Sequence, residues 1–128
     1  MPINKRMKKT LIIGASPNPS RYAYLAAERL LSHGIAIELL GRRKGEVSGQ
    51  PIKTLSSEIS RDIHTVTLYL SEQNQKEYED FILSLKPVRV IFNPGAENPA
   101  FAARLSENGI EAVEGCTLVM LSTGQYNL

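Results

Sequence analysis

The 128-residue sequence contains one cysteine, two histidines and no long apolar run. A single cysteine excludes a disulfide framework and a cysteine-cluster metal site, and His33 and His64 cannot form a zinc site by themselves. No apolar stretch approaches the roughly 18 residues that a membrane span requires, so we expect no membrane partner. The basic start is followed only by the short apolar run 11–15 before two prolines. We therefore expect no signal peptide and a cytoplasmic location.

The composition is typical of one globular domain. Hydrophobic residues make up 42% and charged residues 22%, with no biased tract, which disfavours disordered and fibrous classes. A chain of this length buries roughly two-thirds of its unfolded surface and needs no metal or disulfide to fold. We predict a basic arm over residues 1–8 and a single domain over residues 9–128.

The charges are distributed unevenly along the chain. Residues 1–45 contain nine basic and two acidic residues, whereas residues 46–128 contain six basic and eleven acidic residues. The basic half also contains the one glycine-centred turn that follows a predicted strand and opens a helix. An anionic small-molecule ligand is therefore a reasonable expectation.

Short apolar runs alternate with amphipathic segments along the chain, which is typical of a parallel sheet covered by helices. Strands are predicted over 10–13, 35–40, 65–70, 88–92 and 110–113. Helices are predicted over about 20–33, 71–85 and 98–108, with a last helical turn over 117–121. Residues 45–60 are interpreted as a turn-rich connection. The predicted fold is α/β: a three-layer, Rossmann-like, doubly wound sheet of five parallel strands in the order 3-2-1-4-5.

Such sheets bind ligands beyond the carboxyl ends of the strands, where the strand order reverses. With right-handed crossovers, the predicted order places this crevice above strands one and four. The segments that meet there are expected to be 14–21, 41–44, 69–72 and 93–97.

The first of these segments resembles an incomplete dinucleotide fingerprint. Gly14 begins a Gly-x-Gly-x-x-Gly-like turn, but Ser16 and Pro19 replace the second and third glycines. Ser16 can donate through its backbone and hydroxyl, and the following helix directs free N–H groups at an anion. A cation at a helix start, such as Arg21, interacts unfavourably with the helix dipole unless it pairs with an anion. The alternatives are a turn that serves only geometry and a solvated arginine.

The residues after the second predicted strand indicate which class of nucleotide the crevice suits. NAD-binding proteins usually place an acidic residue there to accept from ribose hydroxyls. This chain has Gly41-Arg42-Arg43-Lys44 instead. Arginine holds a phosphate bidentately, so the segment favours a phosphorylated ribose, as in NADP or CoA, unless it is a solvated loop.

No catalytic constellation is apparent in the predicted crevice, so no catalytic residue is assigned. Both histidines are expected at the opposite end of the sheet, and Cys116 lacks a nearby base, which favours a small, half-buried residue. A basic arm without a recognition helix or exposed aromatic strands does not predict nucleic-acid binding.

The motifs together resemble a known family. Residues 11–21, the segment 45–59, the run 93–98, the turn 108–110 and Cys116 resemble small stand-alone CoA-binding domain proteins. That domain is similar to the N-terminal CoA-binding domain of the succinyl-CoA synthetase alpha subunit. The resemblance covers about residues 8–122 and implies a Rossmann-like fold that holds CoA without transforming it.

The resemblance also implies roles for individual residues. It implies that the pyrophosphate or adenosine side of the ligand is contacted by Gly14, Ala15, Ser16 and Arg21. For the adenine ribose and its 3′-phosphate it implies Gly41, Arg42, Arg43 and Lys44. For the pantetheine path it implies Tyr69, Leu70, Asn93 and Gly95. The family commonly has Asn-Pro after the second strand, where this chain has Gly41-Arg42, and the ligase domain that carries a phosphohistidine is missing, so synthetase activity is not expected.

The prediction is a non-catalytic CoA or acyl-CoA binding module acting as a sensor, carrier or regulator. One alternative is an NADP-dependent enzyme, or an acyl-transfer enzyme completed by a partner or by Cys116. Another is an interaction module with a vestigial crevice. A homodimer or an unknown protein partner is compatible with the apolar segment 117–121.

Overall fold

Seven strands form one sheet within residues 8–126, which are the residues that the computed structural model describes. They are β1 (Lys9–Ile13), β2 (Ile37–Leu40), β3 (Gly45–Val47), β4 (Gln50–Lys53), β5 (Ile63–Leu68), β6 (Arg89–Phe92) and β7 (Glu111–Glu114). Their order is β3-β4-β2-β1-β5-β6-β7. All neighbours are parallel except β3 and β4.

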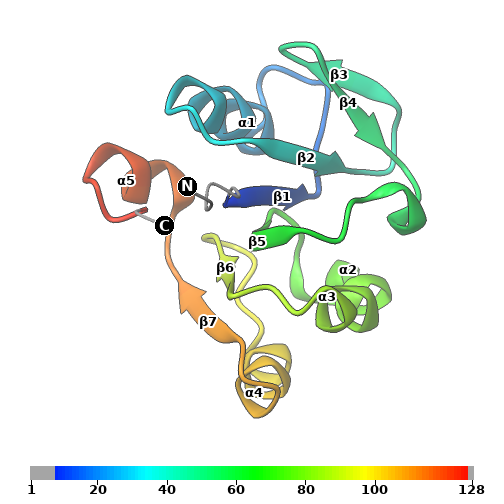
Figure 1. Cartoon of the computed structure of the whole chain (residues 1–128), viewed down its shortest axis with the longest axis vertical. Helices are drawn as coiled ribbons and strands as arrows, with labels where there is room; N and C mark the ends of the chain where they lie inside the picture. The colour runs from blue at the N-terminus through cyan, green and yellow to red at the C-terminus, as the bar shows by residue number, and fades with distance from the viewer. Residues whose placement is uncertain (1–7, 127–128) are drawn as a thin grey trace, which may run out of the picture.

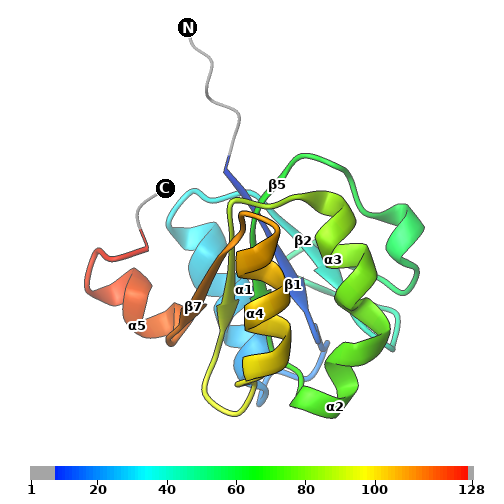
Figure 2. The same cartoon turned by 90° about the horizontal axis from the view of Figure 1, so that it is seen from below.

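Helices cover both faces of the sheet, as Figures 1 and 2 show. They are α1 (Tyr22–Ser32), α2 (Glu72–Gln75), α3 (Glu79–Leu85), α4 (Pro99–Glu107) and α5 (Thr117–Ser122). Alternate residues of a strand point to opposite faces. Leu11 and Ile13 therefore pack with the side chains of α3 and α4, whereas Ile12 packs with those of α1 and α5. This arrangement confirms the three-layer, Rossmann-like α/β architecture.

The predicted number of five strands is wrong, because the segment 45–60 contributes two more. Val47 and Gln50 flank a two-residue turn in which Ser48 and Gly49 have φ values of 49° and 83°. Positive φ at both central residues is the geometry of the tightest hairpins. The turn joins β3 to β4, and β4 pairs parallel with the outer edge of β2.

The additional strand β4 also changes which elements fill the predicted order. Counted along the chain, β4 is the third parallel strand, so the strand predicted over 65–70 becomes the fourth. This fourth parallel strand is β5, and it pairs with β1. The order 3-2-1-4-5 is retained and a sixth parallel strand, β7, is added at the edge. The strand order therefore reverses between β1 and β5, and not between β1 and the strand predicted over 88–92.

The helical run predicted over 71–85 is divided. A 3₁₀ turn, η3 (Lys76–Tyr78), separates α2 from α3, and Lys86 ends α3 in the left-handed conformation before Pro87. A second 3₁₀ turn, η2 (Ser56–Glu58), follows β4. The helix predicted over 98–108 is confirmed, with Asn98 accepting from the Phe101 N–H at 3.1 Å and Pro99 in the first turn.

The predicted basic arm lies almost wholly outside the described residues, which begin at Lys8. The domain boundary at residue 9 thus stays a prediction. Within residues 8–126, no helix is long and apolar enough to cross a membrane.

Candidate functional site

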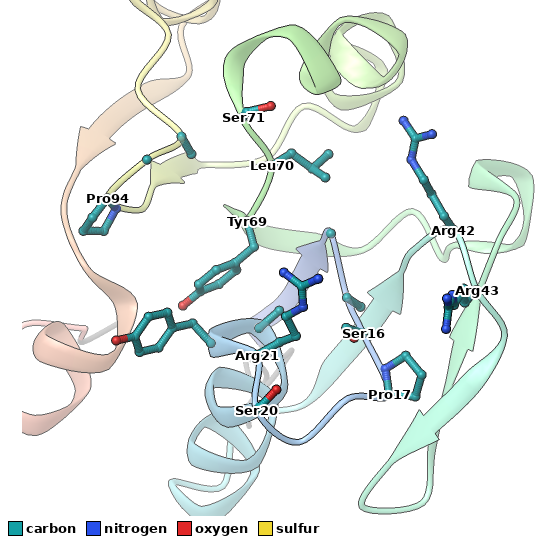
Figure 3. Close-up of a pocket in the computed structure, with 16 residues that line it drawn as sticks. Ser16, Pro17, Ser20, Arg21, Arg42, Arg43, Tyr69, Leu70, Ser71 and Pro94 are labelled. Carbon is teal, nitrogen blue, oxygen red and sulfur yellow. The ribbon is translucent and has the colours of Figure 1, made fainter.

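A crevice of about 560 Å³ opens at the carboxyl ends of β1, β5 and β6, beside the start of α1. This is the point of strand-order reversal, where doubly wound sheets bind ligands. Its lining comes from the four loops that follow β1, β2, β5 and β6 and from the first turn of α1 (Figure 3). The lining residues are Gly14, Ala15, Ser16, Pro17, Ser20, Arg21, Tyr22, Ala23, Arg42, Arg43, Tyr69, Leu70, Ser71, Pro94, Gly95 and Ala96.

Gly14 makes the tight turn that follows β1. Its φ is +95°, and a Cβ placed there would lie 2.5 Å from the carbonyl oxygen of Tyr69. The Gly14 and Ala15 N–H groups both donate to the Leu40 carbonyl at 3.0 Å. The floor of the crevice is thus fixed by the ends of three strands, and only glycine fits at its first position.

The loop that leads into α1 is organised by Asn18. The Asn18 Oδ1 accepts from the Ser20 N–H at 3.0 Å and from the Ser20 hydroxyl at 2.8 Å. The Asn18 N–H donates to the Ser16 hydroxyl oxygen at 3.0 Å, so this hydroxyl already supports the loop. The first helical N–H groups, those of Tyr22 and Ala23, have no hydrogen-bond partner within residues 8–126. Free N–H groups at a helix start favour an anion.

Three arginines line the crevice. Arg21 is the N-cap of α1, and its side chain makes no capping hydrogen bond. Figure 3 shows Arg21 between Tyr69 and Ser16, and Arg43 beside Pro17. Arg42 extends toward η3, where its Nη2 lies 3.4 Å from Glu77 Oε2. Both partners of this pair are more than half exposed, at 62% and 55%, so solvent screens the pair and it contributes little to stability.

Tyr69 lies at the centre of the crevice. Its ring lines the crevice, while its hydroxyl is buried and has no hydrogen-bond partner within the described residues. Burial raises the pKa of Tyr69 well above its usual value, and the neighbouring Thr117, whose geometry falls short of a hydrogen bond, offsets this only in part. The tyrosine is therefore neutral at physiological pH.

Nine of the twelve predicted site residues line the crevice, and three do not. Asn93 is 2% exposed, and its amide holds β5 and α5 together beneath the crevice. Gly41 is buried against the backbone of Ala15. Lys44 is exposed outside the lining, because the chain turns away into β3 after Arg43. The predicted segments thus meet at the crevice while these three side chains lie outside its lining, and ligand binding by any of the twelve stays a prediction.

The remaining lining residues were not singled out from the sequence. They are Pro17, Ser20, Tyr22, Ala23, Ser71, Pro94 and Ala96. Six of them lie within the segments predicted to meet at the strand ends or directly after them, so segment position was the available signal. Ala23 lies in the first turn of α1, and its place in the lining follows from the position of the helix start.

The groups considered for catalysis do not line the crevice. His33 Nδ1 lies 2.8 Å from the Arg29 carbonyl at the end of α1, and His64 Nδ1 lies 2.8 Å from the Thr65 hydroxyl. Cys116 is half-buried before α5. Within residues 8–126, no three histidine, cysteine or acidic side chains gather as a metal site.

The fold and the site together define a Rossmann-like α/β domain with a cationic crevice at its switch point. The model of the CoA binding domain family matches residues 8–122, and the chain belongs to this family. No curated protein matches the chain.

Solved structures show the same fold. The crystal structure of an uncharacterized protein is 60% identical, with a TM-score of 0.89 over 93% of this chain and 98% of that chain. A hypothetical protein from Pyrococcus horikoshii OT3 is 24% identical, with a TM-score of 0.83 over 95% of this chain and 86% of that chain. A protein from Thermus thermophilus is 20% identical, with a TM-score of 0.83 over 93% and 90% of the two chains.

Proposed function

We propose that this protein binds CoA or an acyl-CoA in the crevice and does not transform it. The observation that carries the proposal is that Arg21, Arg42 and Arg43 line one crevice at the strand-order reversal. The end of β2 presents Arg42 and Arg43 where a protein that binds NAD usually presents an acid. Membership of the CoA binding domain family supports the same ligand.

The two ends of the crevice suit the two halves of CoA. The free N–H groups of α1 and the arginines form a cationic side, which suits the phosphates of an adenosine 3′,5′-bisphosphate group. Tyr69, Leu70 and Pro94 form a side without charge, which suits the pantetheine chain. The crevice volume of about 560 Å³ is within the usual range of small-molecule sites.

A non-catalytic role is supported by the lining itself. It contains no histidine and no acidic side chain among the described residues, so it offers no evident general base to Ser16, Ser20 or Ser71. Cys116 is outside the lining. An enzymatic role would be revealed by incubating the protein with acyl-CoA: thioester loss that Cys116→Ser abolishes would contradict the proposal.

Calorimetric titration with CoA, dephospho-CoA, NADP and NAD tests the ligand. CoA should bind at least about tenfold more tightly than dephospho-CoA, because a charge-assisted hydrogen bond contributes about 1.5–3 kcal/mol. Arg43→Ala should remove most of that difference. Arg29→Ala is the matched control, since it deletes the same charge from an exposed position on α1 outside the crevice.

Each of the other outcomes has a definite meaning. Equal affinity for CoA and dephospho-CoA would contradict recognition of a 3′-phosphate, and tighter binding of NADP would favour the oxidoreductase alternative. Failure to bind any of the four would favour a vestigial crevice. The cytoplasmic location and the homodimer stay predictions, which cell fractionation and sedimentation would test.

A further inference from the structure

Gln75 joins the two loops that flank the crevice on the side without charge. It belongs to α2, yet it is completely buried. Its Nε2 donates to the carbonyl oxygen of Leu70 at 2.9 Å and to that of Ala96 at 2.7 Å. Leu70 follows β5 and Ala96 follows β6, and both line the crevice. One side chain therefore spans the separation between two walls of the site.

Both polar atoms of this amide have hydrogen-bond partners. A glutamine amide has two N–H donors, and both are used on carbonyl oxygens, which can only accept. The amide oxygen accepts from Asn98 Nδ2 at 2.9 Å. Because two of the three partners are acceptors, the amide has only one orientation that satisfies them all.

The contact continues into α4. Asn98 is 4% exposed, and its Oδ1 accepts from the Phe101 N–H at 3.1 Å in the first turn of that helix. The helix α2 has only four residues, and so short a helix is not stable by itself. Gln75 supplies three hydrogen bonds that attach α2 to the loop before it, to Ala96 and to Asn98.

We propose that Gln75 is a positioning residue that, with Asn98, holds the 69–71 and 94–97 loops at the separation required for binding the pantetheine half of CoA. This inference rests on the proposed function. It makes Gln75, which lies outside the lining, a determinant of affinity for one half of the ligand only. The adenosine half is held by α1 and the arginines, which Gln75 does not contact.

The test compares two ligands and three variants. Gln75→Leu removes the donors and keeps the side chain similar in size. Asn98→Asp keeps an oxygen that caps α4, but it cannot donate to Gln75 and places a buried carboxylate against the Gln75 amide oxygen. Thr10→Val is the matched control: Thr10 is also completely buried and shares a 2.5 Å hydrogen bond with Tyr126, but it lies near the start of β1, at the other end of the strand from the crevice.

Calorimetry with CoA and with adenosine 3′,5′-bisphosphate supplies the first readout, at a temperature at which each variant gives a native near-UV spectrum. We expect Gln75→Leu to weaken CoA binding about tenfold, as it would if only a tenth of the molecules kept the competent loop separation. Asn98→Asp should weaken it to a similar extent. Both variants should bind adenosine 3′,5′-bisphosphate within about twofold of the parent protein, and Thr10→Val should bind both ligands normally.

Hydrogen exchange of peptides covering 69–76 and 93–99 supplies the second readout, which needs no ligand. Both peptides should exchange faster in Gln75→Leu and Asn98→Asp and stay protected in Thr10→Val. Unchanged exchange, unchanged CoA affinity or an equal loss of both ligands would overturn the inference. Failure of the parent protein to bind CoA would contradict the proposed function, and the positioning role in CoA binding would fall with it.

Discussion

Two glycines allow backbone segments to meet at the floor of the crevice, and they do so for different reasons. Gly14 has a positive φ and lies against the Tyr69 carbonyl, so both conformation and space require it. Gly41 has no such φ, but a Cβ there would collide with the Ala15 carbonyl oxygen. Gly41 therefore supports the turn from behind and does not line the crevice.

Gly41→Ala should accordingly destabilise the protein by about 1–3 kcal/mol, the usual cost of forcing an extra group into a packed site. The added methyl group can be accommodated only if the Gly14–Ser16 turn shifts, so CoA affinity should fall as well. Urea denaturation and calorimetry would measure the two effects. Gly115→Ala is the control, because its nearest atom, Met120 Sδ, would lie at an ordinary 3.6 Å, and its stability should stay within about 0.5 kcal/mol. A Gly41→Ala protein as stable as this control would contradict the steric argument.

The short helix α5 is attached to the sheet by polar contacts at its first residue as well as by apolar packing of side chains such as Leu121. The Thr117 N–H donates to Asn93 Oδ1 at 2.9 Å, and the Thr117 hydroxyl meets that of Thr67 at 2.8 Å. Asn93 Nδ2 also donates to the Thr67 hydroxyl at 2.6 Å and to the Leu68 carbonyl at 2.8 Å. All three side chains are buried, so the loss of any of these hydrogen bonds leaves a polar group that has no partner and that water does not reach.

Asn93→Ala should therefore cost about 2–4 kcal/mol, since each buried polar group left unsatisfied costs about 1–3 kcal/mol. Hydrogen exchange should locate the loss in α5. If Asn93 acts only beneath the crevice, the folded fraction should still bind CoA with an affinity within a few-fold of normal. A stable variant that no longer binds CoA would instead support the prediction that Asn93 contacts the ligand. Asn108→Ala removes an exposed asparagine from the end of α4 and should be nearly neutral.

Sequence patterns predicted the elements with strong periodicity and missed the short ones. The helix predicted over 20–33 is α1, and every predicted strand exists within two residues of its expected bounds. The β3–β4 hairpin was missed because its strands have three and four residues and contain glycine and proline. The signal that would have revealed it was Ser48-Gly49 between Val47 and Gln50, a two-residue hairpin turn.

The site could be predicted as far as segments, because the carboxyl ends of parallel strands meet at one edge of the sheet. Side-chain direction could not, and for this reason Asn93 and Lys44 were assigned to a crevice that they do not line. Gln75 had a detectable signal. Together with Tyr78, Ile82 and Leu85 it follows the spacing i, i+3, i+7, i+10 of one face of the helical run predicted over 71–85, and a polar residue on an apolar face requires buried partners.

At the scale of the whole molecule, a buried carboxylate joins the strands on the cationic side of the sheet. Glu38 on β2 is only 10% exposed and accepts from Lys9 on β1 and Lys53 on β4, each at 3.2 Å. It also accepts from the N–H and hydroxyl of Ser60, which follows η2. Burial raises the pKa of Glu38, but the hydrogen bonds from Ser60 and the two lysines outweigh it, so the pKa lies below its ordinary value.

A pKa that is lower in the folded state makes stability depend on pH in one direction. The contribution of Glu38 is complete above its unfolded pKa of about 4.3 and is lost as the pH falls through the folded value. Glu38→Gln should thus lower stability at pH 7 by about 1–3 kcal/mol, the scale of hydrogen bonds to a charged group, and the difference from the parent should narrow below pH 4.

Urea denaturation between pH 3 and pH 7 would measure this dependence. Some slope should persist in the variant, because the Ser60 hydroxyl and Lys9 also lower the pKa of Asp62. Glu28→Gln, at an exposed position of α1, removes the same charge and should leave the slope unchanged. A constant gap between Glu38→Gln and the parent from pH 7 to pH 3 would show that Glu38 acts through packing and not through its charge. That result would leave the lysines at the start of β1 and the end of β4 without a role in joining β2 to its neighbours.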